Sequence, residues 1–228
     1  MTNLVTTVIN SNHTLVQLDD GKANALSFDM LAAVNSALDE VEHVGKPIII
    51  AGRAGKFCAG FDLNVMRQGG DDTRRILREG GLLSYRLLCC DVPVILAVSG
   101  HALAMGALLL LSADYRIGLS GEYKIGLNEV AIGLTMPYFG VELARNRIAS
   151  GHLQSALTMA KIYDSAGAVE AGFLDELVDE NDLITRAESL ADQLAGLDAE
   201  AHKNTKARLR SELRTVIASA IDEEFGTG

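Results

Sequence analysis

The chain has 228 residues, of which 48% are hydrophobic and 22% charged, and its formal net charge is −10. The hydrophobic content excludes an intrinsically disordered protein. The excess of acidic residues argues against nucleic acid as a partner, because binding to a phosphate backbone needs a basic surface. A chain of this length can bury one large core, alone or with a helical appendage.

The cysteines and the termini bear on the compartment. Cys58, Cys89 and Cys90 are odd in number and two are adjacent, a poor disulfide framework that favours a reducing environment. The N-terminal residues lack the regions of a secretory signal, and the apolar run near 102–111 is shorter than the roughly 20 residues that span a bilayer. We therefore expect a soluble, cytoplasmic protein without a membrane segment. The scattered histidines predict no metal site.

The first half of the chain alternates predicted strands and helices. Short strands are expected at 4–9 and 14–18, joined as a hairpin, and a buried strand at 47–51. Between them, Ser27 is expected to cap a helix. The apolar positions of that helix follow helical spacing: Leu31, Val34, Leu38 and Val41.

A turn rich in glycine and alanine, at 52–63, is expected to lead from the buried strand into a helix-like segment. An exposed loop is predicted at 68–72, followed by a helix over 73–90 in which Gly80 and Gly81 are a possible break. The turn at 52–63 is one place where free backbone donors can be directed at a ligand.

The stretch from 92 to 137 is the most informative. A buried strand at 94–98 is followed by a turn at 99–101 and by a helix entered near 104–106, which is too apolar on every side to lie on the surface. The first N–H groups of a helix have no internal partner, and the helix dipole makes that end partly positive. A strand, a tight turn and a buried helix therefore predict a small anion site made by the main chain.

Strands are also expected at 115–119 and 122–125, and the chain is predominantly helical after Pro137. Helices are predicted at 139–148, 152–159 and 165–172. Two amphipathic stripes follow, the first capped by Asp182: Leu183, Ala187, Leu190 and Leu194, then Leu209, Leu213, Val216 and Ile217. Strands with helices, then helices alone, predict an α/β core over 1–175 and a C-terminal helical region over 176–228.

Glu129 is the one carboxylate in a run of apolar and small residues, GLNEVAIGL. A half-buried carboxylate and an anion site, both presented from a hydrophobic core, suit a reaction in which a proton is removed and oxyanion charge develops.

Four blocks in this order resemble the crotonase superfamily, the enoyl-CoA hydratases and isomerases: residues 22–26, 57–63, 100–114 and the helices around 165–178. The resemblance covers nearly the whole chain. It implies an α/β, crotonase-like spiral of ββα units with a C-terminal helical extension. It also implies a homotrimer or hexamer and an acyl-CoA thioester substrate, with no cofactor besides the coenzyme A that the substrate carries.

Carried over by position, the oxyanion hole of the family would be the backbone N–H groups of Phe61 and Met105. Met105 replaces the usual glycine, but any residue except proline keeps the main-chain donor. Substrate and coenzyme A would lie against the positions that match the family's binding segments: Ala23, Ala25, Leu26, Ala59, Asp62, Leu63, Gly106 and Leu108.

One departure from the hydratases narrows the activity. They carry a catalytic glutamate two residues after the glycine that Gly106 matches, and here that residue is Leu108, whereas the second glutamate is retained as Glu129. A proton shift from C2 to C4 needs one acid–base group, which favours a Δ3,Δ2-enoyl-CoA isomerase. A hydratase, or a hydrolase or decarboxylase with one carboxylate, is the alternative within the fold. A non-catalytic acyl-CoA-binding protein is the alternative from another class.

Several residues have structural interpretations beside functional ones. Glu129 could instead be a structural carboxylate that caps a helix or pairs with an arginine such as Arg145 or Arg147. We interpret Cys58, Asp62, Asp114 and His101 as structural groups. The basic residues of the last helices either contact coenzyme A phosphates or form a solvated face: Lys203, Lys206, Arg208 and Arg210.

Overall fold

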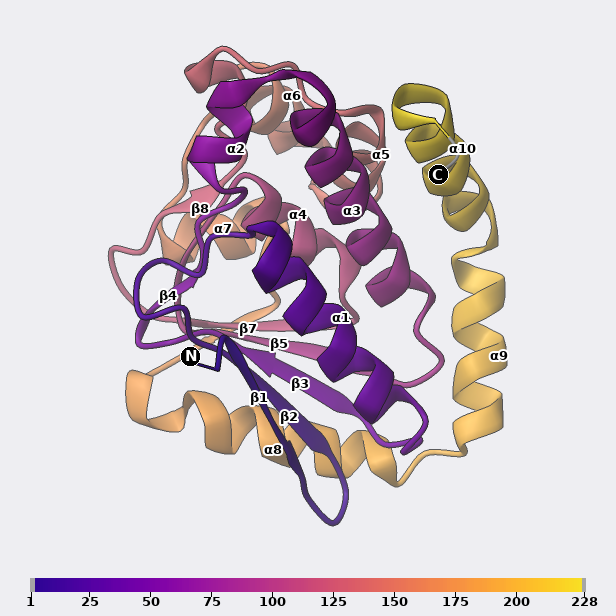
Figure 1. Ribbon diagram of the computed structural model, residues 1–228. Helices are drawn as coiled ribbons and strands as arrows, with labels where there is room; N and C mark the ends of the chain where they lie inside the picture. Colours follow the sequence, from indigo (N-terminus) through magenta and orange to yellow (C-terminus); the bar gives the residue numbers. More distant parts are fainter. Residues whose placement is uncertain (1–2, 227–228) are drawn as a thin grey trace.

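The computed structural model describes residues 3–226 (Figure 1). Its larger sheet has six strands in the order β1-β2-β3-β5-β7-β9. Strands β1 (Val5–Ile9) and β2 (Thr14–Leu18) form the predicted antiparallel hairpin. Four further strands continue the sheet in parallel: β3 (Ile48–Ala51), β5 (Val94–Val98), β7 (Tyr115–Leu119) and β9 (Glu176–Val178).

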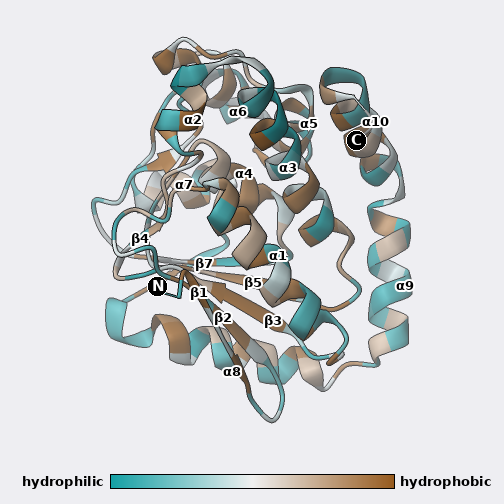
Figure 2. Ribbon diagram, in the orientation of Figure 1, coloured by the Kyte–Doolittle hydropathy of each residue, from teal (hydrophilic) through white to brown (hydrophobic). Residues whose placement is uncertain are grey.

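The two faces of this sheet are covered by different helices (Figure 1). Because side chains alternate along a strand, Ile49, Ile95 and Ile117 face one side, where they form a small core with α8 (Leu183–Ala195). The opposite face belongs to the main core, which includes the inner side of α1 (Phe28–Glu42). The strands at the centre of the sheet are strongly hydrophobic (Figure 2), as expected of parallel strands that are covered on both faces.

A second, three-stranded parallel sheet consists of β4 (Gly55–Cys58), β6 (Gly100–Leu103) and β8 (Ile125–Gly126). The sequence pattern predicts turns at the first two places, where the structure has β4 and β6. It predicts a strand over 122–125, of which only Ile125 belongs to β8. These strands are short and contain glycine, so they lack the alternating apolar pattern that identifies a strand. This sheet carries the segments that enter α2 and α4.

Helix α2 (Leu63–Gln68) is followed at once by α3 (Gly70–Cys89), so the loop expected at 68–72 is wrong. The break expected at Gly80 and Gly81 is also wrong. A Cβ on Gly80 would lie 2.4 Å from the ring of Phe61, and one on Gly81 would lie 3.1 Å from Ile221. The two glycines let neighbouring elements approach an unbroken helix closely.

Helix α4 (Met105–Ser112) is the predicted core helix, and every one of its residues is buried. Three further helices match the predictions to within a few residues: α5 (Tyr138–Arg147), α6 (Ser150–Leu157) and α7 (Ser165–Ala171). Strand β9 pairs with β7, so the sheet extends beyond residue 175, the end expected for the core.

Helix α9 (Ala199–Leu209) runs up one side of the molecule, and α10 (Ser211–Phe225) packs against α3 and α5 (Figure 1). The last predicted stripe is partly wrong, because Leu209 is 82% exposed and Val216 is 38% exposed. A bend between α9 and α10 changes the face that is turned inward, so one continuous stripe does not describe both helices. Asp182 precedes α8 as predicted, but its side chain makes no capping hydrogen bond.

Candidate active site

Two turns from different strands meet at the mouth of a cavity. The first follows β4, where Gly60 has a φ of +90° and Phe61 leads into α2. The second follows β6, where Ala104 has a φ of +49°, a strained value for a residue with a side chain, and α4 begins.

Glycines allow this close approach. A Cβ on Gly60 would lie 2.9 Å from the Cβ of Ala104 and 3.4 Å from the nitrogen of Met105. A Cβ on Gly106 would lie 2.2 Å from the carbonyl oxygen of Cys58. The start of α4 is therefore packed directly against the segment from Cys58 to Gly60.

The main-chain donors of the two turns are not used equally. The N–H of Leu26 donates to the Gly60 carbonyl at 2.8 Å, the N–H of Asp62 donates to the Leu26 carbonyl at 3.1 Å, and the N–H of Ala104 donates to the Gly126 carbonyl at 3.0 Å. The N–H groups of Phe61 and Met105 have no acceptor among residues 3–226. These are the two donors that the resemblance assigns to the oxyanion hole.

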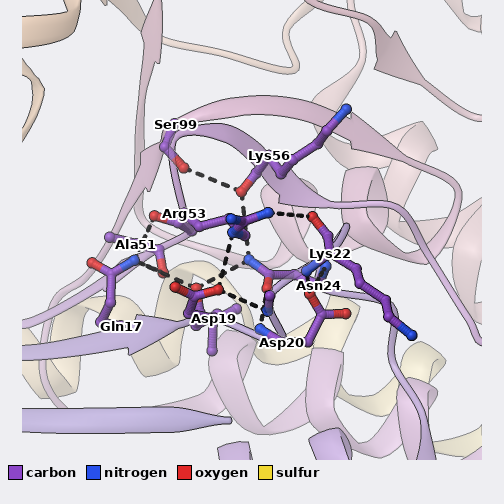
Figure 3. Close-up of polar contacts among 12 residues, drawn as sticks. Gln17, Asp19, Asp20, Lys22, Asn24, Ala51, Arg53, Lys56 and Ser99 are labelled. Carbon is purple, nitrogen blue, oxygen red and sulfur yellow. Dashed lines mark hydrogen bonds and ion pairs between the residues drawn. The ribbon is translucent and has the colours of Figure 1, made fainter. Parts of the chain in front are cut away.

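A polar network behind the turns holds the loop at 20–25 (Figure 3). Buried Asn24, with a φ of +52°, donates through its side chain to the carbonyls of Leu18 and Phe57 at 3.1 Å each. The Asp20 carboxylate accepts from the N–H groups of Asn24 and Ala25, at 2.9 and 3.2 Å. The loop in turn binds the first turn through the N–H of Ala59 and the carbonyl of Ala23, at 3.1 Å.

The cavity has a volume of about 490 Å³ and a mainly apolar wall. Eight of the predicted site residues line it: Ala23, Ala25, Ala59, Phe61, Asp62, Leu63, Leu108 and Glu129. Leu26, Met105 and Gly106 are buried behind that wall. The structure thus brings together four segments that are distant in the chain: the loop with Ala23 and Ala25, residues 59–63, Leu108 and Glu129.

Glu129 lines the cavity from the position immediately before the short 3₁₀-helical turn Val130–Ile132, and it is only 6% exposed. Burial raises the pKa of its carboxyl from 4.5 to about 7. Its Oε2 has no hydrogen-bond partner within residues 3–226. Arg145 pairs instead with Glu142, and Arg147 donates to the Ala113 carbonyl, so the structural pairing considered for Glu129 is not formed.

The other candidate groups have local partners. The Asp62 carboxylate caps α2 by accepting from the N–H of Asn64 at 2.8 Å. His101 accepts from the N–H of Lys124 at 2.8 Å, and burial with two nearby lysines lowers its pKa. Burial raises the pKa of the Cys58 thiol to about 12, which leaves it unreactive. The hydrogen bonds of Asp62 and His101 and the burial of Cys58 agree with the structural interpretations of these residues.

Sequence reasoning missed about half of the wall. The additional lining residues are Met66, Leu77, Leu103, Ala104, Asn128, Ile132, Leu134, Thr135, Pro137 and Phe139. Most are apolar residues of α2, α3 and the segment after Glu129, and their spacing carries no signal of a shared cavity. Asn128 is the exception, because a polar residue beside Glu129 could have been noted. Its Oδ1 is buried and has no partner in the described chain.

Comparison with known proteins agrees with this geometry. The family model "Enoyl-CoA hydratase/isomerase" matches residues 9–226. The chain belongs to this family. A solved enoyl-CoA hydratase/isomerase family protein from Pseudomonas syringae is 39% identical, with a TM-score of 0.96 over 98% of this chain and 97% of that chain. The expected crotonase-like α/β fold is therefore confirmed.

Two relatives in the enoyl-CoA hydratase/isomerase family carry different activities in their names. Enoyl-CoA delta isomerase 1, mitochondrial, from Mus musculus is 26% identical over 86% of this chain and 70% of its own length. Short-chain-enoyl-CoA hydratase from Clostridium acetobutylicum is also 26% identical, over 89% of this chain and 80% of its own length. Overall similarity therefore supports an enzyme of this family without selecting between the two reactions.

Of the four basic residues considered on the last helices, Lys203 and Arg208 are exposed, Lys206 and Arg210 are buried, and none of them lines this cavity. Lys206 and Arg210 are each only 8% exposed and both pair with Asp114, at 2.6 and 2.8 Å. Asp114 also accepts from the N–H of Val94 at 2.7 Å, which confirms its structural role. No helix within residues 3–226 is long and apolar enough to cross a membrane.

Proposed function

We propose that the protein is an enoyl-CoA isomerase that moves a double bond from Δ3 to Δ2 of an acyl-CoA. The thioester oxygen would accept hydrogen bonds from the N–H groups of Phe61 and Met105. The acyl chain would occupy the apolar cavity, and coenzyme A would extend past the loop that carries Ala23 and Ala25.

The proton balance of the reaction needs one group. The Glu129 carboxylate removes a proton from C2, and the electron pair delocalises through the C3–C4 double bond and onto the thioester oxygen. The neutral Glu129 then returns the proton to C4, the double bond forms between C2 and C3, and the carboxylate is regenerated. A pKa near 7 suits both proton transfers, because at neutral pH the charged and the neutral form of the carboxyl differ little in free energy.

The observation that carries the proposal is a lone acid in an apolar cavity. Glu129 and Asp62 are the two carboxylates that line it, and Asp62 is engaged at the start of α2. At the position where the hydratases have their other glutamate, Leu108 lines the cavity and is 1% exposed. Hydration requires a positioned water and a delivered proton, a task that two carboxylates share. The cavity wall at Leu108 supplies no such second group.

The decisive experiment gives the same enzyme preparation either the 3-enoyl-CoA or the 2-enoyl-CoA as substrate. In D₂O, 3-hexenoyl-CoA should be converted to 2-hexenoyl-CoA, and deuterium should enter both thioesters at C2 and C4. NMR and mass spectrometry measure the conversion and the position of the deuterium. Supplied with 2-hexenoyl-CoA, the enzyme should exchange the same positions and form 3-hydroxyacyl-CoA far more slowly.

Other outcomes would select the alternatives. Rapid formation of 3-hydroxyhexanoyl-CoA would make the protein a hydratase, and release of free coenzyme A would make it a hydrolase. Tight binding of acyl-CoA without any exchange at C2 would make it a non-catalytic binding protein. Each of these results would overturn the isomerase proposal.

A further inference from the structure

A second cavity lies at the opposite end of α4 from the candidate active site. Its volume is about 750 Å³, and it opens between α9 and the ends of α4 and α5. The polar and charged residues of its wall are Asp114, Asn146, Arg147, Asp198, His202, Thr205, Lys206 and Arg210. Since α4 has eight residues, about 10 Å of helix separates its two ends.

Three basic side chains, those of Arg147, Lys206 and Arg210, lie together in this wall. The guanidinium groups of Arg147 and Arg210 both donate to the carbonyl oxygen of Ala113, the latter at 3.2 Å. Lys206 and Arg210 share the two carboxylate oxygens of Asp114. Like charges in a partly buried site repel one another unless negative charge balances them.

The available negative charge does not balance them. Asp114 serves two cations, and the Asp198 carboxylate caps α9 by accepting from the N–H of Ala201 at 2.7 Å. Arg147 forms no ion pair with any residue of 3–226. Burial and the nearby cations Arg116 and Arg210 lower its pKa to about 10, although the carboxylates of Asp175 and Asp114 act in the opposite direction. The carbonyls at this end of α4 contribute only a partial charge.

We propose that this cavity binds an oxyanion, a phosphate or carboxylate group, which completes the charge balance around Arg147. A guanidinium offers paired N–H donors that match the geometry of such groups. The wall adds further polar groups beside it, namely Thr205, Asn146 and His202, whose Nδ1 is buried without a partner among the described residues. The surplus is local, because the chain as a whole carries a net charge of −10.

The site is distinct from the one proposed for acyl-CoA. It lies at the end of α4 where the helix dipole is negative, and the two cavities have no lining residue in common. Its test therefore uses stability and direct binding, and it succeeds or fails independently of the isomerase assignment.

The first test measures thermal unfolding of the full chain in sodium phosphate against sodium chloride at equal ionic strength, with isothermal titration calorimetry as the direct readout. Phosphate at 100 times its dissociation constant should raise the Tm by about 5 °C or more. Arg147→Gln should weaken phosphate binding at least tenfold. No phosphate-specific shift in the unaltered protein would overturn the proposal.

A matched pair of variants guards against a folding defect in Arg147→Gln. Thr205 lines the cavity and neighbouring Asn204 does not, and both are exposed residues of α9. Thr205→Glu places a carboxylate in the cavity and should raise the Tm without phosphate, abolish the phosphate response and leave turnover of enoyl-CoA unchanged. Asn204→Glu should leave both the Tm and the phosphate response unchanged. Equal behaviour of the two variants would refute the site.

The oxyanion could be free or could be a carboxylate of a second copy of the chain. Sedimentation across a range of protein concentrations separates these sources. If the sedimentation behaviour and the Tm are both independent of protein concentration, the site is assigned to a free oxyanion. If phosphate dissociates copies of the chain, and Thr205→Glu does the same, a carboxylate from a second copy is the natural occupant. Both results retain the charge argument.

Discussion

Helix α4 is buried along its whole length, and its two ends meet different surroundings. At its start lie an apolar cavity, two backbone donors without acceptors in the described chain, and a carboxyl with an unpaired oxygen. At its other end, Arg210 and Lys206 are held by carbonyls of the preceding segments and by Asp114. Buried polar groups are normally satisfied, and at the second end this holds for Lys206 and Arg210. The unsatisfied groups at the first end are therefore where chemistry is expected.

The most direct test of the difference between the two ends of α4 removes the acid at the first end. Glu129→Gln should lower kcat for 3-enoyl-CoA about 10²–10⁴-fold, because the proton carrier is lost while the shape is retained. The dissociation constant for a saturated acyl-CoA should stay within about twofold. Steady-state kinetics and calorimetry measure the two quantities, and full activity in the variant would exclude Glu129 as the catalytic group.

The other end should respond in stability. Asp114→Asn leaves Lys206 and Arg210 without their carboxylate, so the free energy of unfolding should fall by about 3–5 kcal/mol. Asp91→Asn is the control, because the exposed pair of Asp91 with Lys203 should contribute less than about 1 kcal/mol. Urea denaturation measures both changes. Equal losses would mean that the buried network contributes no more to stability than the exposed pair does.

A third prediction uses pH to show the energetic cost of the acid. The pKa of Glu129 is raised from 4.5 to about 7, so the folded state favours the neutral carboxyl. The stability that this group contributes is present below pH 4.5 and is lost as the pH rises through 7. Glu129→Gln, which resembles the neutral form, should therefore match the parent protein near pH 4.5 and exceed it by up to about 3 kcal/mol above pH 7.

Denaturant unfolding of both proteins across this pH range measures that difference. A gap that stays constant with pH would show that the carboxyl titrates normally, which would contradict the arrangement described for the first end of α4.

The smallest predicted effect concerns the contact between the two turns. Gly60→Ala adds a Cβ that would meet Ala104 at 2.9 Å, in a backbone with φ of +90°, and should cost about 1–3 kcal/mol of stability. Gly45→Ala carries a similar φ of +72° with nothing within 4 Å and is the control for strain alone. Only Gly60→Ala should also reduce kcat, because it displaces the donor of Phe61. If Gly60→Ala and Gly45→Ala reduced kcat equally, this turn would not be part of the oxyanion hole.

The sequence could predict the elements that rely on local patterns. The buried strands at 94–98 and 115–119 and the amphipathic α1 have strong periodic signals, and a helix as apolar as α4 has few places to lie except the core. Glu129 was recognisable because a carboxylate in an apolar run is unusual.

What the sequence could not predict depends on contacts between distant segments. Lys206 is buried because it pairs with Asp114, a residue 92 positions earlier, and no local pattern predicts that the two are in contact. The glycines of α3 look like a helix break until Phe61 and Ile221 are placed against them. The cavity wall beyond Glu129 likewise combines residues whose only common property is their final position.

The paired glycines of α3 have a consequence for the whole molecule. With no side chains at Gly80 and Gly81, a single helical backbone separates the ring of Phe61 on one side from Ile221 of α10 on the other. The C-terminal helix and the ring of Phe61, whose N–H is proposed to bind the thioester oxygen, thus pack against adjacent residues of the same helix. A larger side chain at Ile221 would therefore act on Phe61 through the backbone of α3, so a residue that does not line the cavity should influence turnover.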